Sequence, residues 1–377
     1  MKNYVISDPR PYEGDKGSYA KNVVLTANSK KVSGLGKSLE RTTDSTTLGG
    51  LDDNVINECY IDLSLDKLRK LDNDMYARQS FMRSRLRFLG SANLRIFVIK
   101  LRIESGQRLE DPDYGYLLSL LDWKYNDLPL MPVLEFAETF ETPDQIRIYD
   151  EFVRTMISRR NSYSRLDDMA MSIPIFFPRR RLGDLFDLYG DIGPTFVAMD
   201  LDNKRVDSIP DGRYDAVLGH FREQKEERTF LYGMNVKPCK DGKENASALD
   251  VQSLHWSFNA VGPTHYRFIR KLVISDSWET AGRIYDPGSI GYIPIDEGHL
   301  QGFQDWVDDR YGFRFDEDYS KNVRSTYPYI QRYNFAKANQ ELMEISESLK
   351  RGETEMVDEA YDLLPAGARK MAGAGVS

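Results

Sequence analysis

Acidic residues at the end of an apolar run are the first candidates for chemistry in this sequence. The run TFVAMDLD, residues 195–202, ends in Asp200 and Asp202, two positions apart, so on an extended strand both side chains share one face. Two carboxylates on one face can raise the pKa of one of them, which suits a general acid or base, or can hold a divalent cation. The alternative is a solvated loop pair that faces Lys204 and Arg205.

Other polar residues follow apolar runs elsewhere in the chain. Glu135 comes near the end of LPLMPVLEF, residues 128–136, and is either a catalytic candidate or a strand-end carboxylate paired with a neighbouring arginine. His265 follows a Gly-Pro turn and is either a site residue or a loop histidine with local hydrogen bonds. The remaining candidates of this kind are Glu138, Asn235, Lys237, Asn259 and Thr264. A basic run, Arg179, Arg180 and Arg181, suits phosphate oxygens because guanidinium groups bind them through paired N–H groups.

Apolar strand-like runs alternate with helical segments along most of the chain. We expect strands at residues 95–103, 128–136, 173–178, 195–202, 229–237 and 258–262. Helical spacing of apolar residues predicts helices at 63–88, 114–123, 142–160, 182–189, 214–227 and 246–254. This alternation predicts parallel β/α units, and continuously apolar strands fit a sheet that is buried on both faces.

The alternation favours either a closed barrel or a large doubly wound sheet. No G-x-G-x-x-G follows the first strand of the series, which disfavours the dinucleotide-binding version. We therefore expect an α/β fold with a (β/α)8 TIM-like barrel over residues 56–300. Reactive groups of such barrels lie at the carboxyl ends of the strands, where the candidates above fall.

The two ends of the chain differ from the middle in composition and in apolar pattern. Residues 1–55 are rich in Ser, Thr, Gly and Lys, which predicts a flexible or loop-rich N-terminal arm with a short strand possible at 23–26. Residues 301–377 are expected to hold C-terminal helices, at 302–310 and 333–350, followed by a frayed tail.

Composition limits the classes of function. The chain has 377 residues, 41% of them hydrophobic and 29% charged, which is typical of a soluble globular protein. No apolar run is long enough to span a membrane and no secretory signal begins the sequence, so a cytoplasmic location without membrane contact is expected. The net charge of -8 argues against indiscriminate coating of nucleic acid but allows a local basic groove.

The sequence predicts neither a cofactor nor a metal site. Cys59 and Cys239 lie far apart and form no C-x-x-C pair, which excludes a cysteine-rich zinc site and gives no disulfide framework. Neither H-x-H nor H-E-x-x-H spacing occurs among His220, His255, His265 and His299. A G-x-S-x-G elbow is also absent, so an α/β-hydrolase triad is not expected.

A resemblance to a known family rests on the stretch FLYGMNVKP, a helical segment and then FNAVGPTHYRF. This stretch resembles the late barrel of the tRNA-guanine transglycosylase family, where a strand of the form F-D-C-V-x-P-T-R follows a similar strand and helix. Phe258, Val261, Pro263 and Thr264 match that pattern. The stretch that ends in YIPID, residues 292–296, and the last helical segment resemble the family in outline.

The departures from the family concern its chemistry. The aspartate that attacks the ribose in the family falls at Asn259 here, and an amide cannot form the same covalent glycosyl intermediate. The arginine after Pro-Thr is His265. The three cysteines and one histidine that bind zinc in the family have no counterpart, and its Asp-Ser-Gly-Gly signature is missing. The resemblance therefore supports the barrel more than the reaction.

Three hypotheses of function follow. The first is a divergent transglycosylase-like enzyme that exchanges or recognises a 7-deazaguanine-type base in tRNA or DNA, with Asp200 or Asp202 as nucleophile or base. Glu135 and Asn259 are its further catalytic candidates, and substrate would be bound by Asn235, Thr264, His265, Arg179, Arg180 and Arg181. The second is a non-catalytic partner subunit of a base-modifying enzyme, in a homo- or heterodimer. The third is a metal-assisted barrel hydrolase that uses Glu135, Asp200 and Asp202.

Overall fold

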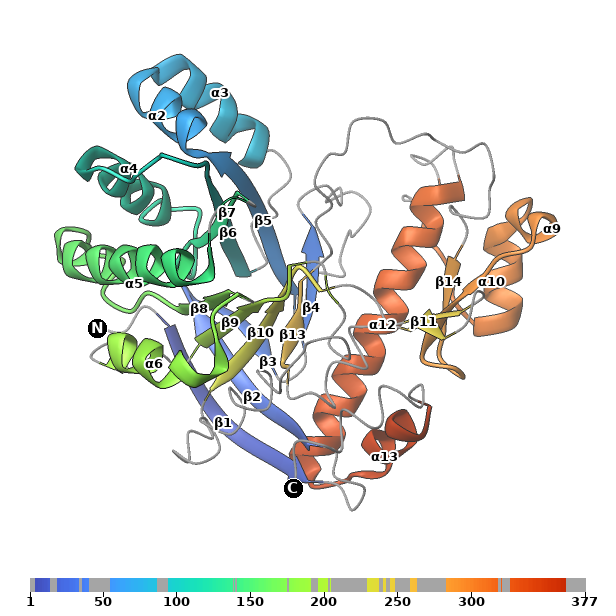
Figure 1. Ribbon diagram of the computed structural model, residues 1–377. Helices are drawn as coiled ribbons and strands as arrows, with labels where there is room; N and C mark the ends of the chain where they lie inside the picture. The colour runs from blue at the N-terminus through green and yellow to red at the C-terminus, as the bar shows by residue number, and fades with distance from the viewer. Residues whose placement is uncertain are drawn as a thin grey trace.

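A parallel β-sheet lies at the centre of a mixed α/β structure (Figure 1). The computed structural model describes residues 4–13, 19–33, 36–40, 55–86, 94–137, 139, 141–174, 176–190, 196–202, 204, 229–236, 240–241, 245–247, 258–262, 283–317, 320 and 326–363. None of the helices within these ranges is long and apolar enough to cross a membrane.

The central sheet holds eight strands within the described residues. They are β4 (Gly36–Glu40), β5 (Val55–Ser64), β6 (Leu94–Ile103), β7 (Val133–Phe136), β8 (Met171–Pro174), β9 (Phe196–Asp200), β10 (Phe230–Met234) and β13 (Ala260–Val261). Their spatial order is β7-β6-β5-β4-β13-β10-β9-β8, and every pairing is parallel.

The first and last strands of that order approach each other. Leu130, just before β7, forms a parallel bridge with Ala170, just before β8. Two backbone hydrogen bonds support this bridge: Met131 N donates to Ala170 O at 2.9 Å, and Ala170 N donates to Pro129 O at 2.8 Å. Strands at opposite ends of the sheet order are thus joined by main-chain bonds.

Helices follow the strands and cover one face of the sheet. They are α2 (Leu65–Asn73), α3 (Met75–Leu86), α4 (Asp111–Leu121), α5 (Thr142–Arg159) and α6 (Leu182–Gly190). In α5, a buried stripe that includes Ile146, Tyr149 and Phe152 recurs at three or four positions, the spacing that places residues on one helical face. This helix begins at Thr142, as expected, with Glu141 as its N-cap residue and Pro143 in the first turn.

Alternate residues of the strands belong to two separate apolar clusters. Cys59, Ile61 and Leu63 of β5 pack with the helices, on what we call the outer face of the sheet. Ile56 of β5 packs instead with Ile96, Val98, Phe196 and Ala198 of the other strands, on what we call the inner face. A two-residue period therefore sorts each strand between two buried faces, as expected for a parallel sheet.

The N-terminal region differs from the expected loop-rich arm. Strands β1 (Tyr4–Glu13), β2 (Tyr19–Ala27) and β3 (Lys30–Ser33) form an antiparallel sheet of three strands within the described residues, and β4 belongs to the central sheet. Asn28 and Ser29 both have positive φ, the conformation of a tight two-residue hairpin turn. Val23, Leu25 and Val32 join the inner apolar cluster, and burial of these residues stabilises strands that the polar composition concealed.

A buried carboxylate ties this N-terminal hairpin to the central sheet. Asp127, 2% exposed, accepts hydrogen bonds from Asn28 Nδ2 at 3.0 Å and Lys30 Nζ at 2.6 Å. Arg95 at the start of β6 donates to the same carboxylate from its backbone N at 2.9 Å and from its guanidinium at 3.0 and 3.1 Å. Burial alone would raise the pKa of Asp127, but the hydrogen bonds from Arg95, Lys30 and Asn28 outweigh it and lower that pKa.

The C-terminal region packs a second sheet against a long helix. Strands β11 (Lys240–Asp241), β12 (Asn245–Ser247), β14 (Arg283–Asp286) and β15 (Gly291–Pro294) pair antiparallel in the order β11-β12-β15-β14. Helices α9 (Glu297–Leu300), α10 (Phe303–Tyr311), α12 (Thr326–Arg351) and α13 (Glu355–Asp362) follow. Residues 246–247 are thus strand where we expected a helix, and the rest of that expected helix lies outside the described residues, as does the expected helix at 214–227.

Helix α12 connects the two sheets. It contacts β14 and also β2 and β4, and Figure 1 shows it running between the central strands and the C-terminal hairpin. Asn334 on α12 accepts a hydrogen bond from Tyr285 N at 2.7 Å and donates one to Arg283 O at 2.9 Å. Its side-chain amide thus satisfies two backbone groups of β14, the edge strand of the described C-terminal sheet.

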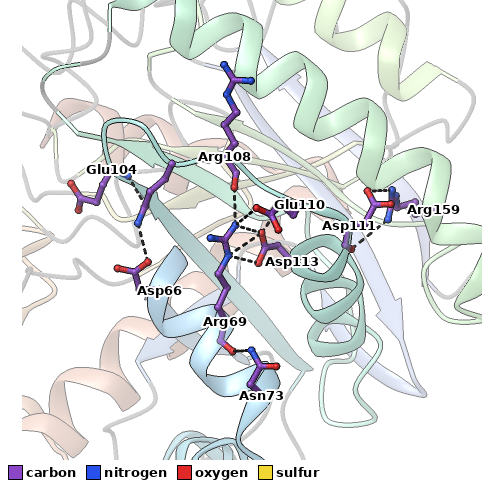
Figure 2. A network of polar contacts seen from close by, with 10 residues as sticks. Asp66, Arg69, Asn73, Glu104, Arg108, Glu110, Asp111, Asp113 and Arg159 are labelled. Carbon is purple, nitrogen blue, oxygen red and sulfur yellow. Dashed lines mark hydrogen bonds and ion pairs between the residues drawn. The ribbon is translucent and has the colours of Figure 1, made fainter.

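A polar network fixes the loop that follows β6 (Figure 2). Arg69 points from α2 to Asp113 of α4, with Nε at 3.0 Å from Oδ1 and Nη2 at 2.9 Å from Oδ2. The same guanidinium donates to Arg108 O at 2.9 Å, and Gln107 Nε2 donates to Asp66 Oδ1 at 3.0 Å. Paired guanidinium–carboxylate bonds hold a fixed geometry, so this network steadies the carboxyl end of β6.

Replacement of Asp127 is expected to destabilise the protein in a pH-dependent way. Asp127→Ala leaves Arg95 and Lys30 largely buried without their carboxylate, and breaking such a pair removes about 3 kcal/mol from the free energy of unfolding at pH 7. Because the folded-state pKa of Asp127 is depressed, its contribution is present above the unfolded value of about 3.9 and is lost as pH falls through the folded value.

Urea denaturation of the wild type and variant from pH 7 to pH 3 measures this difference. The gap between the two proteins should close toward the acid end. Asp187→Ala, at an exposed position of α6, is the matched control and should leave stability within about 0.5 kcal/mol of the wild type. Equal stability of Asp127→Ala and wild type at pH 7 would contradict the proposed anchoring.

Candidate functional site

The inner face of the sheet is apolar at one end and charged toward the carboxyl ends of its strands. Glu58, Tyr60 and Asp62 alternate along β5 with the outer-face residues Cys59, Ile61 and Leu63. Lys100 and Arg102 alternate in the same way along β6 with Ile99, Leu101 and Ile103. We call the following set the charged cluster: Glu58, Tyr60, Asp62, Lys100, Arg102, Glu135, Asp200 and Asp202.

Lys100 joins the two aspartates that the sequence singled out. Its Nζ lies 2.7 Å from Asp202 Oδ1 and 3.7 Å from Asp200 Oδ2. The backbone N of Asp202 donates to Asp200 Oδ1 at 3.0 Å. These three residues, from β6 and from the end of β9, form one unit of a single cation and two carboxylates, which we call the Lys100 unit.

The aspartates meet for a different reason from the one expected. Strand β9 ends at Asp200, and Asp202 has φ +48°, in the left-handed region that non-glycine residues seldom adopt. Asp202 therefore reaches Asp200 through a turn rather than along a strand face. Asn235, just after the neighbouring strand β10, has φ +53° and is 4% exposed. Such backbone conformations often gather at functional sites.

Burial makes Asp200 a weak acid. Asp200 is 7% exposed, and burial raises its pKa; the Lys100 charge and the backbone N–H of Asp202 lower it, whereas the charges of Asp202 and Glu58 raise it. The net result is a raised pKa. Asp202, by contrast, keeps 47% of its side chain exposed. The two carboxylates thus occupy different environments, an arrangement that divides acid and base roles between paired carboxyl groups.

Tyr60 keeps its proton in this environment. Burial raises the pKa of the Tyr60 phenol, and the nearby carboxylates of Asp200, Asp62, Glu58 and Asp202 raise it further. A protonated phenol beside carboxylates is a hydrogen-bond donor.

A second cation, Arg102, pairs with Asp62 and Glu135. Arg102 Nη2 lies 3.3 Å from Asp62 Oδ2, and its Nε lies 3.5 Å from Glu135 Oε2. Glu135 is 9% exposed and is thus the strand-end carboxylate with an arginine partner that the sequence allowed. It pairs with Arg102, whereas Asp200 and Asp202 pair with Lys100.

Glu58 of β5 is held by a residue on the same face of β10, which lies three strands away in the sheet order. Its carboxylate is fully buried and accepts a hydrogen bond from Tyr232 Oη of β10 at 2.5 Å. The backbone of Gly262 passes close by, with its N donating to Gly233 O at 2.6 Å. A Cβ at Gly262 would overlap Glu58 Oε2 and lie 2.7 Å from Tyr232 Oη. The backbone of Gly262, just before Pro263 and Thr264, thus passes too close to Glu58 and Tyr232 to leave room for a larger residue.

Asn259 lies nearer the amino-terminal ends of the strands than the two aspartates do. Its Oδ1 accepts a hydrogen bond from Leu231 N at 3.0 Å, its own N donates to Leu231 O at 2.8 Å, and it is 1% exposed. Asp200 pairs in register with Met234, three residues after Leu231, which is about 10 Å along the strand. The structure therefore does not bring Asn259 to the level of Asp200, and its amide completes the pairing of β13 with β10.

The arginine run lies at the same edge of the sheet as the charged cluster. Arg179, Arg180 and Arg181 form a short 3-10 turn, η2 (Arg179–Arg181), between the carboxyl end of β8 and α6. Arg181 pairs with Asp150 at 2.7 Å and with Asp184 at 3.0 Å, so it anchors the turn. Arg179 and Arg180 are exposed. The candidates Glu138, Lys237, Thr264 and His265 lie outside the described residues.

Sequence reasoning missed five members of the charged cluster: Glu58, Tyr60, Asp62, Lys100 and Arg102. A signal was present, because the segments E-C-Y-I-D and K-L-R place polar residues at every second position inside otherwise apolar strands. The expected strand at 95–103 rests on its β-branched residues and the helix expected from residue 63 on apolar spacing, so neither expectation uses this period of charge. The two-residue period of charge indicates a polar stripe on one face of a buried strand.

Neither a protein-family model nor a curated protein matches this chain. Within the described residues, no group of three or more His, Cys, Asp and Glu side chains is placed to hold a metal ion.

The Lys100 unit places a buried carboxyl group with a raised pKa beside a half-exposed carboxylate that binds an ammonium group. This arrangement suits proton transfer together with carboxylate nucleophilic or electrostatic catalysis.

Substitution of Gly262 tests the close approach to Glu58. Gly262→Ala is expected to lower the free energy of unfolding by about 2 kcal/mol, because the added methyl overlaps Glu58 and Tyr232. Gly115→Ala is the matched control: Gly115 lies inside α4 with open space around its Cα, so alanine there should raise stability by up to about 1 kcal/mol. Urea denaturation at neutral pH measures both variants. Wild-type stability of Gly262→Ala would show that Glu58 and Tyr232 do not occupy this space.

Proposed function

We propose that the eight described strands close into a (β/α)8 barrel, with the inner face as its interior and the charged cluster at its carboxyl-terminal mouth. The bridge between Leu130 and Ala170 supports closure, because it joins the two ends of the strand order. The order also follows the chain around the sheet, from β4 through β10 to β13 and back to β4. Catalytic residues of such barrels lie at this mouth.

For this barrel we infer glycosyl transfer: exchange of a heterocyclic base in a nucleic acid. The observation that carries the inference is the Lys100 unit, in which one carboxyl is buried and inclined to hold a proton and the other is half exposed beside an ammonium group. Reactions at a glycosidic carbon commonly use two carboxyl groups in these two roles.

Asp200 and Asp202 account for each proton transfer and each bond change in the proposed exchange. The Asp202 carboxylate attacks C1′ of the nucleoside, the C1′–N bond breaks, and the departing base takes a proton from Asp200. An incoming base returns a proton to Asp200 and attacks C1′, which releases Asp202. The buried acid and the accessible nucleophile correspond to the observed exposures, 7% for Asp200 and 47% for the Asp202 side chain.

Two further features support a nucleic-acid substrate, either tRNA or DNA. Arg179 and Arg180 are exposed at the same sheet edge, and guanidinium groups suit contacts with phosphates. The resemblance of FNAVGPTHYRF to the tRNA-guanine transglycosylase pattern points to the same class of substrate. In this proposal Asp202 replaces the family's aspartate, since Asn259 is engaged with Leu231, and Thr264 and His265 remain substrate-binding candidates.

A second candidate function is nucleic-acid binding without turnover, as a subunit of a base-modifying enzyme. The pairing of the cluster favours it: Lys100 binds Asp200 and Asp202, Arg102 binds Asp62 and Glu135, and Tyr232 binds Glu58. Carboxylates in stable ion pairs can also serve structure or recognition alone.

Base exchange into nucleic acid tests the first function. We expect the wild type to incorporate radiolabelled guanine or 7-deazaguanine into tRNA or into single- or double-stranded DNA. Asp202→Asn should reduce the rate at least about 100-fold, because the nucleophile is lost. Asp187→Asn, an equivalent change at an exposed site, should leave the rate unchanged. Binding of any of these nucleic acids without exchange would reject this function and favour the second; a rate unchanged by Asp202→Asn would reject the proposed nucleophile.

A further inference from the structure

Lys100 is a single cation that serves two carboxylates. It lies on β6, is 7% exposed, and reaches across to the end of β9. The steps proposed above give it no bond to make or break. Its position between Asp200 and Asp202 nevertheless gives it a task that neither aspartate can perform.

We infer that Lys100 is a positioning residue that holds the Asp202 carboxylate in place and limits how tightly Asp200 holds its proton. The ammonium group is within hydrogen-bond distance of Asp202 Oδ1, at 2.7 Å, but not of Asp200 Oδ2, at 3.7 Å. Charge attraction also falls with distance, so the cation favours ionisation of Asp202 more than of Asp200.

Solvent exposure acts in the same direction. The side chain of Asp202 is 47% exposed and that of Asp200 is 8% exposed, so an ionised Asp200 loses more hydration. The backbone N–H of Asp202 reaches Asp200 Oδ1, which leaves Oδ2 as the oxygen able to hold a proton. Burial therefore favours the protonated form of Asp200, and Lys100 acts against it.

Among the described residues that the electrostatics of Asp200 involve, Lys100 is the cation. Glu58 and Tyr60 lie on β5, and Tyr149 of α5 packs on the outer face, where its Oη donates to Ser172 O. Lys100 is the positive charge that lowers the pKa of Asp200, and it opposes the effects of burial and of Glu58 and Asp202. Without Lys100, Asp200 should hold its proton still more tightly.

A functional consequence follows, and it rests on the proposed function. When Asp202 forms its bond to C1′, its charge disappears and Lys100 loses its nearer partner. The ammonium then acts chiefly on Asp200 and strengthens it as an acid at the step where the departing base needs a proton. Release of Asp202 restores the original balance. Lys100 would thus couple the two halves of the exchange.

This role of Lys100 can be tested without any activity. Protein labelled with 13C at the aspartate carboxyl carbon is titrated by NMR between pH 4 and pH 9, and Asp200→Asn and Asp202→Asn assign the two resonances. We expect the pKa of Asp200 to lie above the usual aspartate value. Lys100→Met should raise the proton affinity of Asp200 at least about tenfold, whereas Lys100→Arg, which keeps the charge, should change it much less. Lys100→Gln gives a second neutral variant if Lys100→Met does not fold.

Two results would overturn the inference: an Asp200 titration that neither neutral variant alters, or a neutral variant in which the pKa of Asp200 falls. The outcome is separate from that of the base-exchange assay. An Asp200 shift in Lys100→Met without exchange activity in the wild type would reject the proposed function and keep this role of Lys100, and exchange activity with an unaltered Asp200 titration would do the reverse.

Discussion

The charged cluster depends on one ammonium group, that of Lys100, which lies between two aspartates on a buried face of the sheet. Taking charges out of water is unfavourable unless each is paired and hydrogen-bonded. Lys100 and Asp200 are both less than a tenth exposed, so they depend on each other and on Asp202. The left-handed turn at Asp202 brings its backbone N–H and its side chain to the same pair. The described members of the charged cluster comprise five carboxylates and two cations, so the position of each cation is critical.

The rest of the fold positions that cluster. The parallel strands end at one edge of the sheet, and the two-residue period turns every second side chain to the inner face. On that face, charged side chains of β5, β6 and β9 lie close to one another. Below the charges the same face is apolar, and residues of β2 and β3 join that apolar cluster. Asp127 fixes the hairpin of β2 and β3 to the start of β6, while Arg69 and Asp113 steady the loop at its other end. Strand β6, which carries Lys100 and Arg102, is thus held at both ends.

Local patterns in the sequence predicted the elements whose stability comes from their own periodicity. Helices α5 and α6 and strands β6, β9 and β10 lie close to their expected positions, because a continuous apolar run or a helical stripe is visible within a few residues. Of the strands in residues 4–40, only a short one at 23–26 was expected, and it lies within β2. The others were missed, because their burial depends on contacts with distant strands and on one carboxylate, Asp127, that no local pattern reveals.

The candidate site could be predicted only in part for the same reason. Asp200 and Asp202 were found from their spacing, but the residue that joins them is Lys100, which lies on another strand about a hundred positions earlier in the chain. The resemblance aligns Asn259 with the family's nucleophile, but its depth follows from the register of β13 on β10, which is a property of the sheet and not of the motif. Pairing across strands is a tertiary property, and the sequence shows only which residues are available for it.

The proposed function requires the Lys100 unit for chemistry and not for stability. The most direct test is the free energy of unfolding of the triple variant Lys100→Met, Asp200→Asn and Asp202→Asn, measured by urea denaturation beside the wild type. Asparagine at 200 retains an oxygen for the Asp202 backbone N–H, and methionine fills the volume of the lysine stem. Removal of a complete buried ion-pair group is often neutral or stabilising, so the account predicts a stability equal to or above that of the wild type. A loss of about 3 kcal/mol or more would contradict it and show that the unit is structural.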